Sequence, residues 1–407
     1  VIGGERVVPV FLMNTILATF IIITVYFVIN SLFGFLPAIL SALLLIFSPR
    51  DFMPFLWGQW PERFAYAFVP LILYFFYKYF ITYSKEEKKP AYLYITALLL
   101  GINILIHPLV FFHSAIALAV LYILLAIKQK KLVFNVKHIS IAAIIFIALF
   151  MMFPNQTFNI FAQFSRDSTE SNAQSSFDFS RLLQWSLNPQ DYAGSVPANY
   201  FSFREMHGDW SLYNLSHYFG FLPPFLGNFI FLLNFNFLLI FLFFGIIFLL
   251  IRREEKDLFL LAWLIGLYLV LHRDLIGKAT FLHRSLSASA HIFAPLTAIG
   301  AIYIASAIKL PPNFNKYLKY GIAALFIALV FSVNMAYASK ILNKDTYHDF
   351  LSTLSKEQYQ AAEWILENAD TRYNVSVIGI PHQQNLLSAT SKKIRWSAAV
   401  SQHVSRF

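Results

Sequence analysis

Two carboxylates stand in a short charged segment between apolar stretches of the chain. The segment covers residues 48–63, with the sequence SPRDFMPFLWGQWPER, and contains Asp51 and Glu62. A carboxylate beside a bilayer can ligate a divalent cation such as Mg²⁺ or Mn²⁺, or it can act as a general base on a hydroxyl group. Asp51 and Glu62 are therefore candidate catalytic and metal-binding residues.

The surroundings of these two acids allow two interpretations. Trp57 and Trp60 lie in the same segment, and tryptophan prefers the membrane–water interface, where its ring could also stack on a sugar or a lipid head group. In the alternative interpretation both acids are solvated, with Arg50 or Arg63 as partners.

A second group of charges lies in residues 272–284, HRDLIGKATFLHR, which contain Arg273, Lys278 and Arg284. Arginine presents a fork of donors that matches phosphate oxygens, so this cluster is a candidate site for a phosphate or diphosphate. Contact with anionic lipid head groups is the alternative.

Three histidines lie at or inside apolar stretches. His107 and Pro108 fall at a turn between two of them, His113 lies inside the second, and His291 precedes Pro295 in a later one. Polar residues at membrane depth are costly and often functional. A histidine near a helix end can also simply cap the helix or meet water.

The run 204–210, REMHGDW, contains His207, Asp209 and Trp210. His207 and Asp209, together with His217, could approach one metal ion, although their spacing is not specific for one. A role as a lid or as part of a substrate-binding loop fits the run better. No phosphate-binding glycine loop, zincin motif or nucleophile elbow occurs in the sequence.

The composition of the chain indicates that membrane-spanning helices position these residues. Of the 407 residues, 58% are hydrophobic and 13% are charged, whereas soluble domains have about 25% charged residues. The chain is therefore predicted to be an all-α polytopic membrane protein. Cysteine is absent, which excludes disulfides and thiolate chemistry. The net charge of +10 does not predict a nucleic-acid partner, because the Lys and Arg residues lie mainly in short loops between apolar runs.

Ten apolar segments are candidate spans: 7–30, 33–47, 63–83, 91–106, 108–127, 139–153, 225–251, 258–271, 285–308 and 320–338. The loops 84–90, 128–138, 252–257 and 309–319 each carry three or four Lys or Arg residues, so the positive-inside rule places them in the cytoplasm. The loops 48–62, 154–224 and 272–284 then lie outside. We expect an integral protein of the cytoplasmic membrane, with its long loops and its C-terminal segment extracytoplasmic.

Two domains are expected, a membrane domain over 1–338 and the start of a soluble α/β domain over 339–407. In the second, 355–368 has apolar residues at helical spacing and 374–380 reads as a β-strand. The chain starts at Val1 and ends at Phe407 inside this second domain, so we expect truncation at both ends.

The layout from Gly3 to Tyr77 resembles the GT-C superfamily of membrane glycosyltransferases. This superfamily includes protein O-mannosyltransferases, aminoarabinose lipid A transferases and oligosaccharyltransferase catalytic subunits. The matching elements are Gly3-Gly4-Glu5-Arg6 before a span, the turn 31–34, a span ending at Phe47-Ser48-Pro49, and a later span that opens with Glu62-Arg63. Downstream, HRSLSASAHIFAPLTAIGAIYIA (283–305) and EQYQAAEWILENA (357–369) are similar to later parts of the family.

The resemblance implies transfer of a sugar from a polyprenyl-phosphate or polyprenyl-diphosphate donor to a glycan, lipid or protein acceptor at the outer face of the cell envelope. Arg284, Arg273 and Lys278 would then neutralise the phosphate leaving group. The family's catalytic carboxylate, often in an Asp-x-Asp pair, lies in the first outer loop, which would end just before Val1. This sequence contains no Asp-x-Asp. Asp51 and Glu62 lie in the next outer loop, where some members place a further metal-binding or acceptor-orienting acid.

Two other functions fit the same composition. A polysaccharide polymerase or ligase also has many spans and a large outer loop, and would rely on outer arginines and a histidine without a metal ion. A transporter or non-catalytic scaffold fits less well, because transporters usually carry intramembrane charges and broken helices. The interiors of the predicted spans carry few charges.

Overall fold

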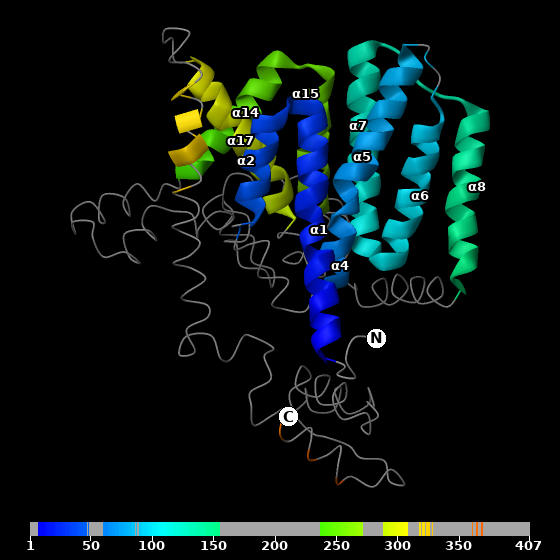
Figure 1. Cartoon of the computed structure of the whole chain (residues 1–407). Coiled ribbons are helices and arrows are strands. Elements are labelled where there is room, and N and C mark those ends of the chain that lie inside the picture. Colours follow the sequence, from blue (N-terminus) through cyan, green and yellow to red (C-terminus); the bar gives the residue numbers. More distant parts are fainter. Residues whose placement is uncertain are drawn as a thin grey trace, which may run out of the picture. The chain divides into compact units, whose positions relative to one another are not determined.

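The computed structural model describes residues 7–46, 48, 60–85, 87, 89–154, 237–271 and 288–307, and single helical positions between 317 and 368. All regular secondary structure at these positions is helical (Figure 1), as the composition predicts. Contacts divide the chain into one unit of Val1–Leu17, Leu56–Gly58 and Ile341–Phe407 and another of Ala18–Phe55 and Gln59–Lys340. Apart from the first turns of α1, the helices named below belong to the second unit. The soluble α/β domain after residue 338 stays a prediction, because most of its residues lie outside the described ranges.

The helices follow the predicted apolar segments from the first to the ninth. They are α1 (Val7–Phe33), α2 (Phe35–Ile46), α4 (Trp60–Tyr66), α5 (Phe68–Ser84), α6 (Ala91–Ile106), α7 (Pro108–Gln129), α8 (Val136–Met152), α14 (Phe237–Arg252), α15 (Glu255–Leu271) and α17 (Ser289–Ala307). The tenth segment, 320–338, lies mostly outside the described residues.

Four stretches of helix in the described ranges are long and apolar enough to cross a membrane. They are Leu12–Phe33, Pro61–Ser84, Pro108–Gln129 and Ser289–Ala307. Shorter apolar helices cover Phe35–Ile46, Ala91–Ile106, Val136–Met152 and Phe241–Arg252. These lengths support an integral membrane protein, since a crossing needs about 20 apolar residues. Ten crossings and their orientation stay predictions.

Single residues set the breaks between neighbouring helices. Gly34, with a φ of 91°, separates α1 from α2 in a conformation that side chains disfavour. Pro108 opens α7 and leaves His107 extended between α6 and α7. Ala67 separates α4 from α5 just before Pro70, which has no N–H to donate to the helix. Each break therefore has a local cause in the sequence.

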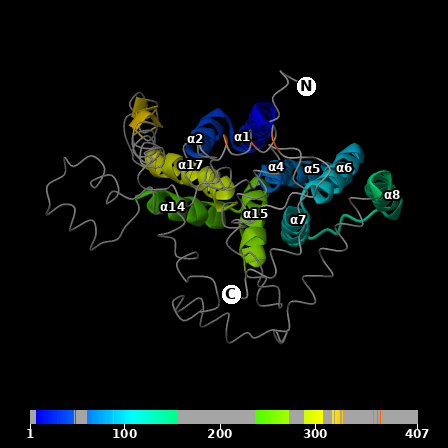
Figure 2. The same ribbon diagram turned by 90° about the horizontal axis from the view of Figure 1, so that it is seen from below.

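The first group of helices consists of α14, α17 and α2. α14 packs most extensively against α17, and α17 packs next against α2 (Figures 1 and 2). Gly245 and Gly300 lie at the α14–α17 crossing, where a Cβ atom on Gly300 would overlap the carbonyl oxygen of Phe241. Small residues allow such backbone-to-backbone contact between membrane helices.

The second group consists of α4, α5, α6, α7, α8 and α15. α7 packs against α15 where a Cβ atom on Gly266 would lie 2.6 Å from the Cβ atom of Ala117. α8 packs against α6, and its Phe146 stacks on Phe111 of α7 with ring centroids 5.8 Å apart. The contacts of α15 with α14 and α17 are much less extensive than its contact with α7, so the two groups meet along a thin boundary.

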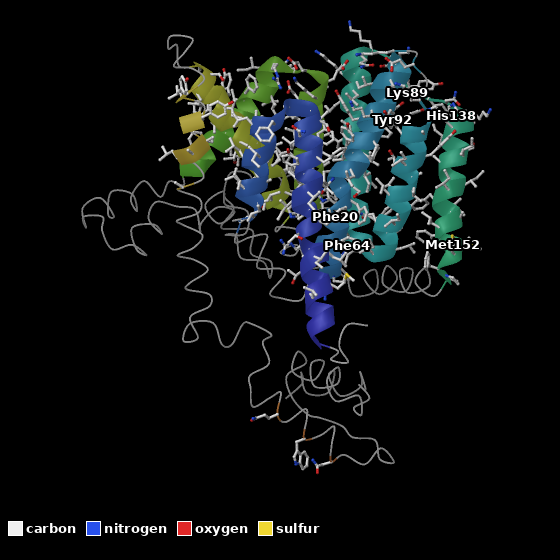
Figure 3. All side chains as sticks on the ribbon, viewed as in Figure 1. Phe20, Phe64, Lys89, Tyr92, His138 and Met152 are labelled. Atoms are coloured by element: carbon white, nitrogen blue, oxygen red, sulfur yellow. The ribbon has the colours of Figure 1, made fainter. Side chains whose placement is uncertain are left out.

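The part of α1 in the second unit joins the second group through aromatic contacts. The rings of Phe20 and Phe64 have centroids 6.3 Å apart, and Phe20 also approaches Phe68 of α5 at 6.2 Å (Figure 3). Further along, Phe27 meets Tyr74 edge-on at 5.6 Å. Such tilted and edge-on pairs stabilise more than their buried area alone.

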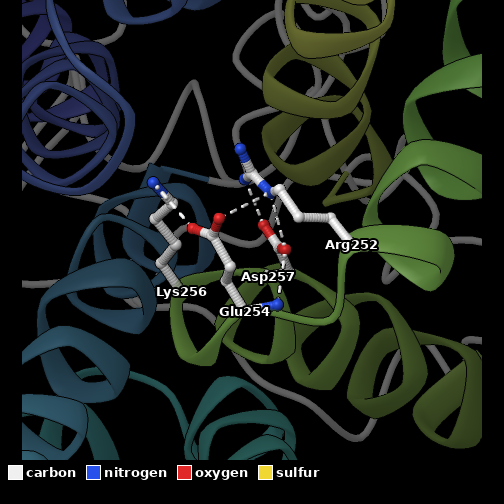
Figure 4. Close-up of polar contacts among 4 residues, drawn as sticks. All are labelled: Arg252, Glu254, Lys256 and Asp257. Carbon is white, nitrogen blue, oxygen red and sulfur yellow. Dashed lines mark hydrogen bonds and ion pairs between the residues drawn. The ribbon is translucent and has the colours of Figure 1, made fainter.

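The turn between α14 and α15 is held by a network of ion pairs and hydrogen bonds (Figure 4). Arg252 donates through Nε to Asp257 Oδ2 at 2.9 Å and through a second nitrogen to Oδ1, while the backbone N–H of Glu254 donates to Oδ2 at 2.8 Å. Lys256 Nζ lies 3.0 Å from Glu254 Oε2, and this hydrogen bond holds the pKa of Glu254 below its usual value. Asp257 is fully buried, and both of its carboxylate oxygens accept hydrogen bonds within this turn.

Candidate active site at the α6–α7 turn

Glu62 and His107 come together where α4 begins and α6 turns into α7. Glu62 is 3% exposed, and its Oε2 lies 3.8 Å from Nε2 of His107. This distance is longer than a hydrogen bond, and the pair is ionic only when the imidazole is protonated. Burial of Glu62 differs from the expectation, raised as an alternative, that this acid is solvated.

The position of His107 follows from the one-residue break between two helices. Its backbone N–H donates to the Asn103 carbonyl at 2.9 Å, and its own carbonyl accepts from the N–H groups of Val110 and Phe111 at 3.1 Å. Pro108 has no N–H and a fixed φ, which suits the first position of α7. The backbone of His107 is therefore fixed at the tip of a tight helical hairpin, and its side chain lies beside Glu62.

Asn103 fixes α6 against α4 one turn below His107. Its Nδ2 donates to the carbonyl of Ala65 at 2.8 Å, and the side chain is fully buried. This bond lies next to the break at Ala67, where the regular helical pattern of α4 and α5 is interrupted. Asn103 thus sets the register between the helix that carries Glu62 and the turn that carries His107.

Tyr66 links three helices deeper in the same region. Its ring meets His113 of α7 edge-on at 5.7 Å and His291 of α17 edge-on at 5.6 Å, and all three side chains are buried. The contact with His291 spans the thin boundary between the two groups of helices. Neither ring nitrogen of His113 has a hydrogen-bond partner among the residues that the structure describes.

These polar residues lie on neighbouring turns of the same helices. Glu62 and Tyr66 are four residues apart on α4, and Asn103 and His107 are four residues apart at the end of α6, so each pair lies on one face. Sequence reasoning singled out Glu62, His107, His113 and His291 but missed Tyr66 and Asn103. The missing signal was this spacing of four between polar residues within apolar segments.

The remaining predicted site residues lie outside the described residues. They are Asp51, Trp57, His207, Asp209, Trp210, Arg273, Lys278 and Arg284. Trp60 is the first residue of α4, but its side chain is not described. Their proposed roles stay predictions.

The predicted metal-binding role of Asp51 and Glu62 stays a prediction. Within the described ranges, no three His, Cys, Asp or Glu side chains are grouped so that they could hold a metal ion. Mg²⁺ often binds proteins through one or two carboxylates and keeps several waters.

No protein-family model and no curated protein matches the sequence. Among solved structures the chain is similar to the Archaeoglobus fulgidus oligosaccharyltransferase in its apo form, with 15% identity and a TM-score of 0.49. It is similar at 14% identity and the same TM-score to that enzyme tethered by a disulfide bond to an acceptor peptide containing the NVT sequon. Both matches cover 94% of this chain and 52% of the other, so the chain spans about half the length of those structures. At this TM-score the likeness supports no conclusion about fold or function.

Proposed function

We propose that the chain is part of a membrane glycosyltransferase that transfers a sugar from a polyprenyl-phosphate or polyprenyl-diphosphate donor to an acceptor at the outer face of the membrane. The observation that carries this proposal is the buried carboxylate of Glu62, held 3.8 Å from the imidazole of His107. A buried acid at the end of an apolar helix is costly, and such residues are usually functional. The resemblance of the sequence layout to GT-C enzymes supplies the reaction class.

In the proposed reaction an acceptor hydroxyl or amide attacks the anomeric carbon of the sugar, and the bond from that carbon to the phosphate oxygen breaks. The bonding electron pair leaves with the phosphate. Glu62 accepts the proton of the attacking group, and a general base of this kind contributes about 10²–10⁴-fold to the rate. His107 stabilises the Glu62 carboxylate when protonated and can pass the proton onward.

Residues outside the described ranges would complete the site. Arg273, Lys278 and Arg284 would stabilise the negative charge that develops on the phosphate. In the alternative role, in which Glu62 ligates a divalent cation and does not act as the base, Asp51 would join it in holding Mg²⁺ or Mn²⁺, and the cation would supply charge stabilisation at the phosphate.

The test compares two carboxylates in membranes containing the full chain. Glu62→Gln removes the proposed base and should reduce transfer from synthetic short-chain polyprenyl-phosphate and polyprenyl-diphosphate sugars by at least about 100-fold. Glu87→Gln is the matched control, because Glu87 is exposed and paired with Lys89 at 3.1 Å. Transfer is measured by the radiolabelled sugar appearing in the acceptor fraction.

Two outcomes bear on this assignment. Unchanged transfer by Glu62→Gln would remove Glu62 from the reaction. Full transfer after complete chelation would remove the divalent cation and favour a metal-independent polymerase or ligase.

A further inference from the structure

The connection between α7 and α8 and the helix ends beside it carry four lysines and no acidic residue. Lys128, Lys130, Lys131 and Lys137, here called the lysine rim, are all exposed. From residue 88 to residue 166 the chain contains no Asp or Glu. The adjacent segment 85–89, KEEKK, has three lysines and two glutamates and so adds one net positive charge, and Glu87 is paired with Lys89 at 3.1 Å.

Exposed apolar side chains alternate with these lysines. Leu132 is 75% exposed and Phe134 is 66% exposed, and Ile127 and Val136 on either side are also exposed. Val133 between them is buried and anchors the connection. Apolar side chains interleaved with ammonium groups are typical of a surface that dips into the boundary between head groups and acyl chains.

The connection is held in place by side-chain hydrogen bonds. Lys131 Nζ donates to the Ser84 carbonyl at 3.0 Å, and Asn135 Nδ2 donates to the Tyr83 hydroxyl at 2.7 Å. The Tyr94 hydroxyl is hydrogen-bonded to Nδ1 of His138 at 2.7 Å.

Figure 3 shows His138 and Lys89 at the same end of the helices. The lysine rim is therefore presented on an ordered support joined to α5 and α6.

The depth of the rim follows from the length of α7. This helix has 22 residues, which corresponds to roughly 33 Å, about the thickness of the hydrocarbon core. Lys128 lies in its last turn and Lys130 just beyond it, so both reach the level of the head groups. A cation at this level is attracted to anionic lipid, which strengthens binding roughly fivefold per lysine.

The turn between α14 and α15 lies at the same end, because Gln129 Nε2 donates to Glu255 Oε1 at 2.8 Å. There, Arg252, Arg253 and Lys256 are offset by Glu254, Glu255 and Asp257. The α7–α8 connection and the α14–α15 turn therefore lie at the same end of the helices but differ in net charge. The α14–α15 turn is a suitable control for the lysine rim.

We propose that the lysine rim, together with Leu132 and Phe134, is a binding site for the head group of an anionic phospholipid. The ammonium groups bind the phosphate, and the two apolar side chains insert between the acyl chains. This site is independent of the proposed transfer reaction, because it lies at the opposite end of α7 from His107.

The experiment measures the lipid retained by the purified full chain. The protein is extracted into detergent with equal amounts of phosphatidylglycerol and phosphatidylcholine, and bound lipids are counted by native mass spectrometry. Lys130→Gln/Lys137→Gln removes two charges whose side chains form no hydrogen bond or ion pair within the described part of the chain. The preference for phosphatidylglycerol should fall at least tenfold, since each lysine contributes roughly fivefold.

Three comparisons make the result decisive. Arg253→Gln/Lys256→Gln removes the same charge from the balanced turn and should keep the preference of the parent chain. Lys130→Arg/Lys137→Arg should keep it as well, because charge and topology are preserved.

Leu132→Ser/Phe134→Ser should lower lipid retention although every lysine remains. Equal binding of the two lipids by the parent chain, or equal losses in the two charge-removal variants, would overturn the proposal.

Discussion

The turn after α14 and the start of α4 each bury a carboxylate at a helix end, but the two carboxylates face different partners. Asp257 receives two bonds from Arg252 and one from the backbone of Glu254. Glu62 faces His107 at 3.8 Å, beyond hydrogen-bond length. Asp257 is held by hydrogen bonds from an arginine and from the backbone of its own turn, whereas Glu62 faces an imidazole whose charge changes with its protonation. The comparison separates a structural charge from a candidate chemical one.

The largest effect on this comparison is expected from Arg252→Ala. Removing one partner of a buried pair leaves an uncompensated charge, so the free energy of unfolding should fall by about 3–5 kcal/mol. Denaturant titration in detergent measures this loss. Arg253→Ala is the control, because the exposed Arg253 donates to the Leu250 carbonyl and should change stability by less than about 1 kcal/mol. A loss in Arg252→Ala as small as that expected for Arg253→Ala would show that Asp257 does not depend on Arg252.

A second variant, His113→Leu, tests whether the polar region around Tyr66 is present for function. A buried imidazole whose nitrogens have no hydrogen-bond partner in the described part of the chain costs stability. Leucine should therefore leave the free energy of unfolding unchanged or raise it by up to about 1 kcal/mol. Sugar transfer should fall at least about tenfold if the region serves the reaction, as in other trade-offs between stability and activity.

The neighbouring Ser114 provides the matched control for His113. Its hydroxyl donates to the Val110 carbonyl at 3.0 Å within α7, so Ser114→Ala should leave both thermal unfolding and transfer nearly unchanged. A loss of about 2 kcal/mol or more in His113→Leu alone would assign this histidine to the fold.

The smallest effect is expected from Glu254→Gln. The hydrogen bond from Lys256 holds the pKa of Glu254 below 4.5, its ordinary value. The stabilisation is therefore fully present above pH 4.5 and is lost as the pH falls through the lower pKa of the folded state. Because the pair is exposed, the difference should be below about 0.5 kcal/mol. Melting temperatures of parent and variant should converge as the pH falls through the lowered pKa of Glu254; a difference that grows with acidity would contradict this sign.

The sequence predicts helices well where local chemistry marks their ends. The predicted segment 91–106 coincides with α6, because Pro90 precedes it and His107-Pro108 ends it. α8 begins at Val136, three residues before its prediction, because Asn135 caps it by accepting from the His138 N–H at 3.2 Å. The polar residues Lys137 and His138 in this first turn favour a loop in the sequence, which places the predicted start of the helix too late.

The site was less predictable, because its contacts join residues far apart in the chain. Glu62 and His107 could each be singled out by type, but their proximity depends on how α4 packs against α6 and α7. The bond from Asn103 to the Ala65 carbonyl joins positions 38 apart in the chain and cannot be read from either segment alone. The edge-on contacts of Tyr66 depend on three helices together.

The glycine crossing of α14 and α17 has a mechanical consequence. With backbones in direct contact at Gly245 and Gly300, there are few side chains that could slide or repack, so the two helices must move as one body. Their contacts with α15 are limited, and Arg252 with Asp257 closes one end of that boundary. A movement of the first group of helices against the second would therefore bend the two connections between them that lie within the described residues, the α1–α2 turn at Gly34 and the α14–α15 turn, and would separate His291 from Tyr66.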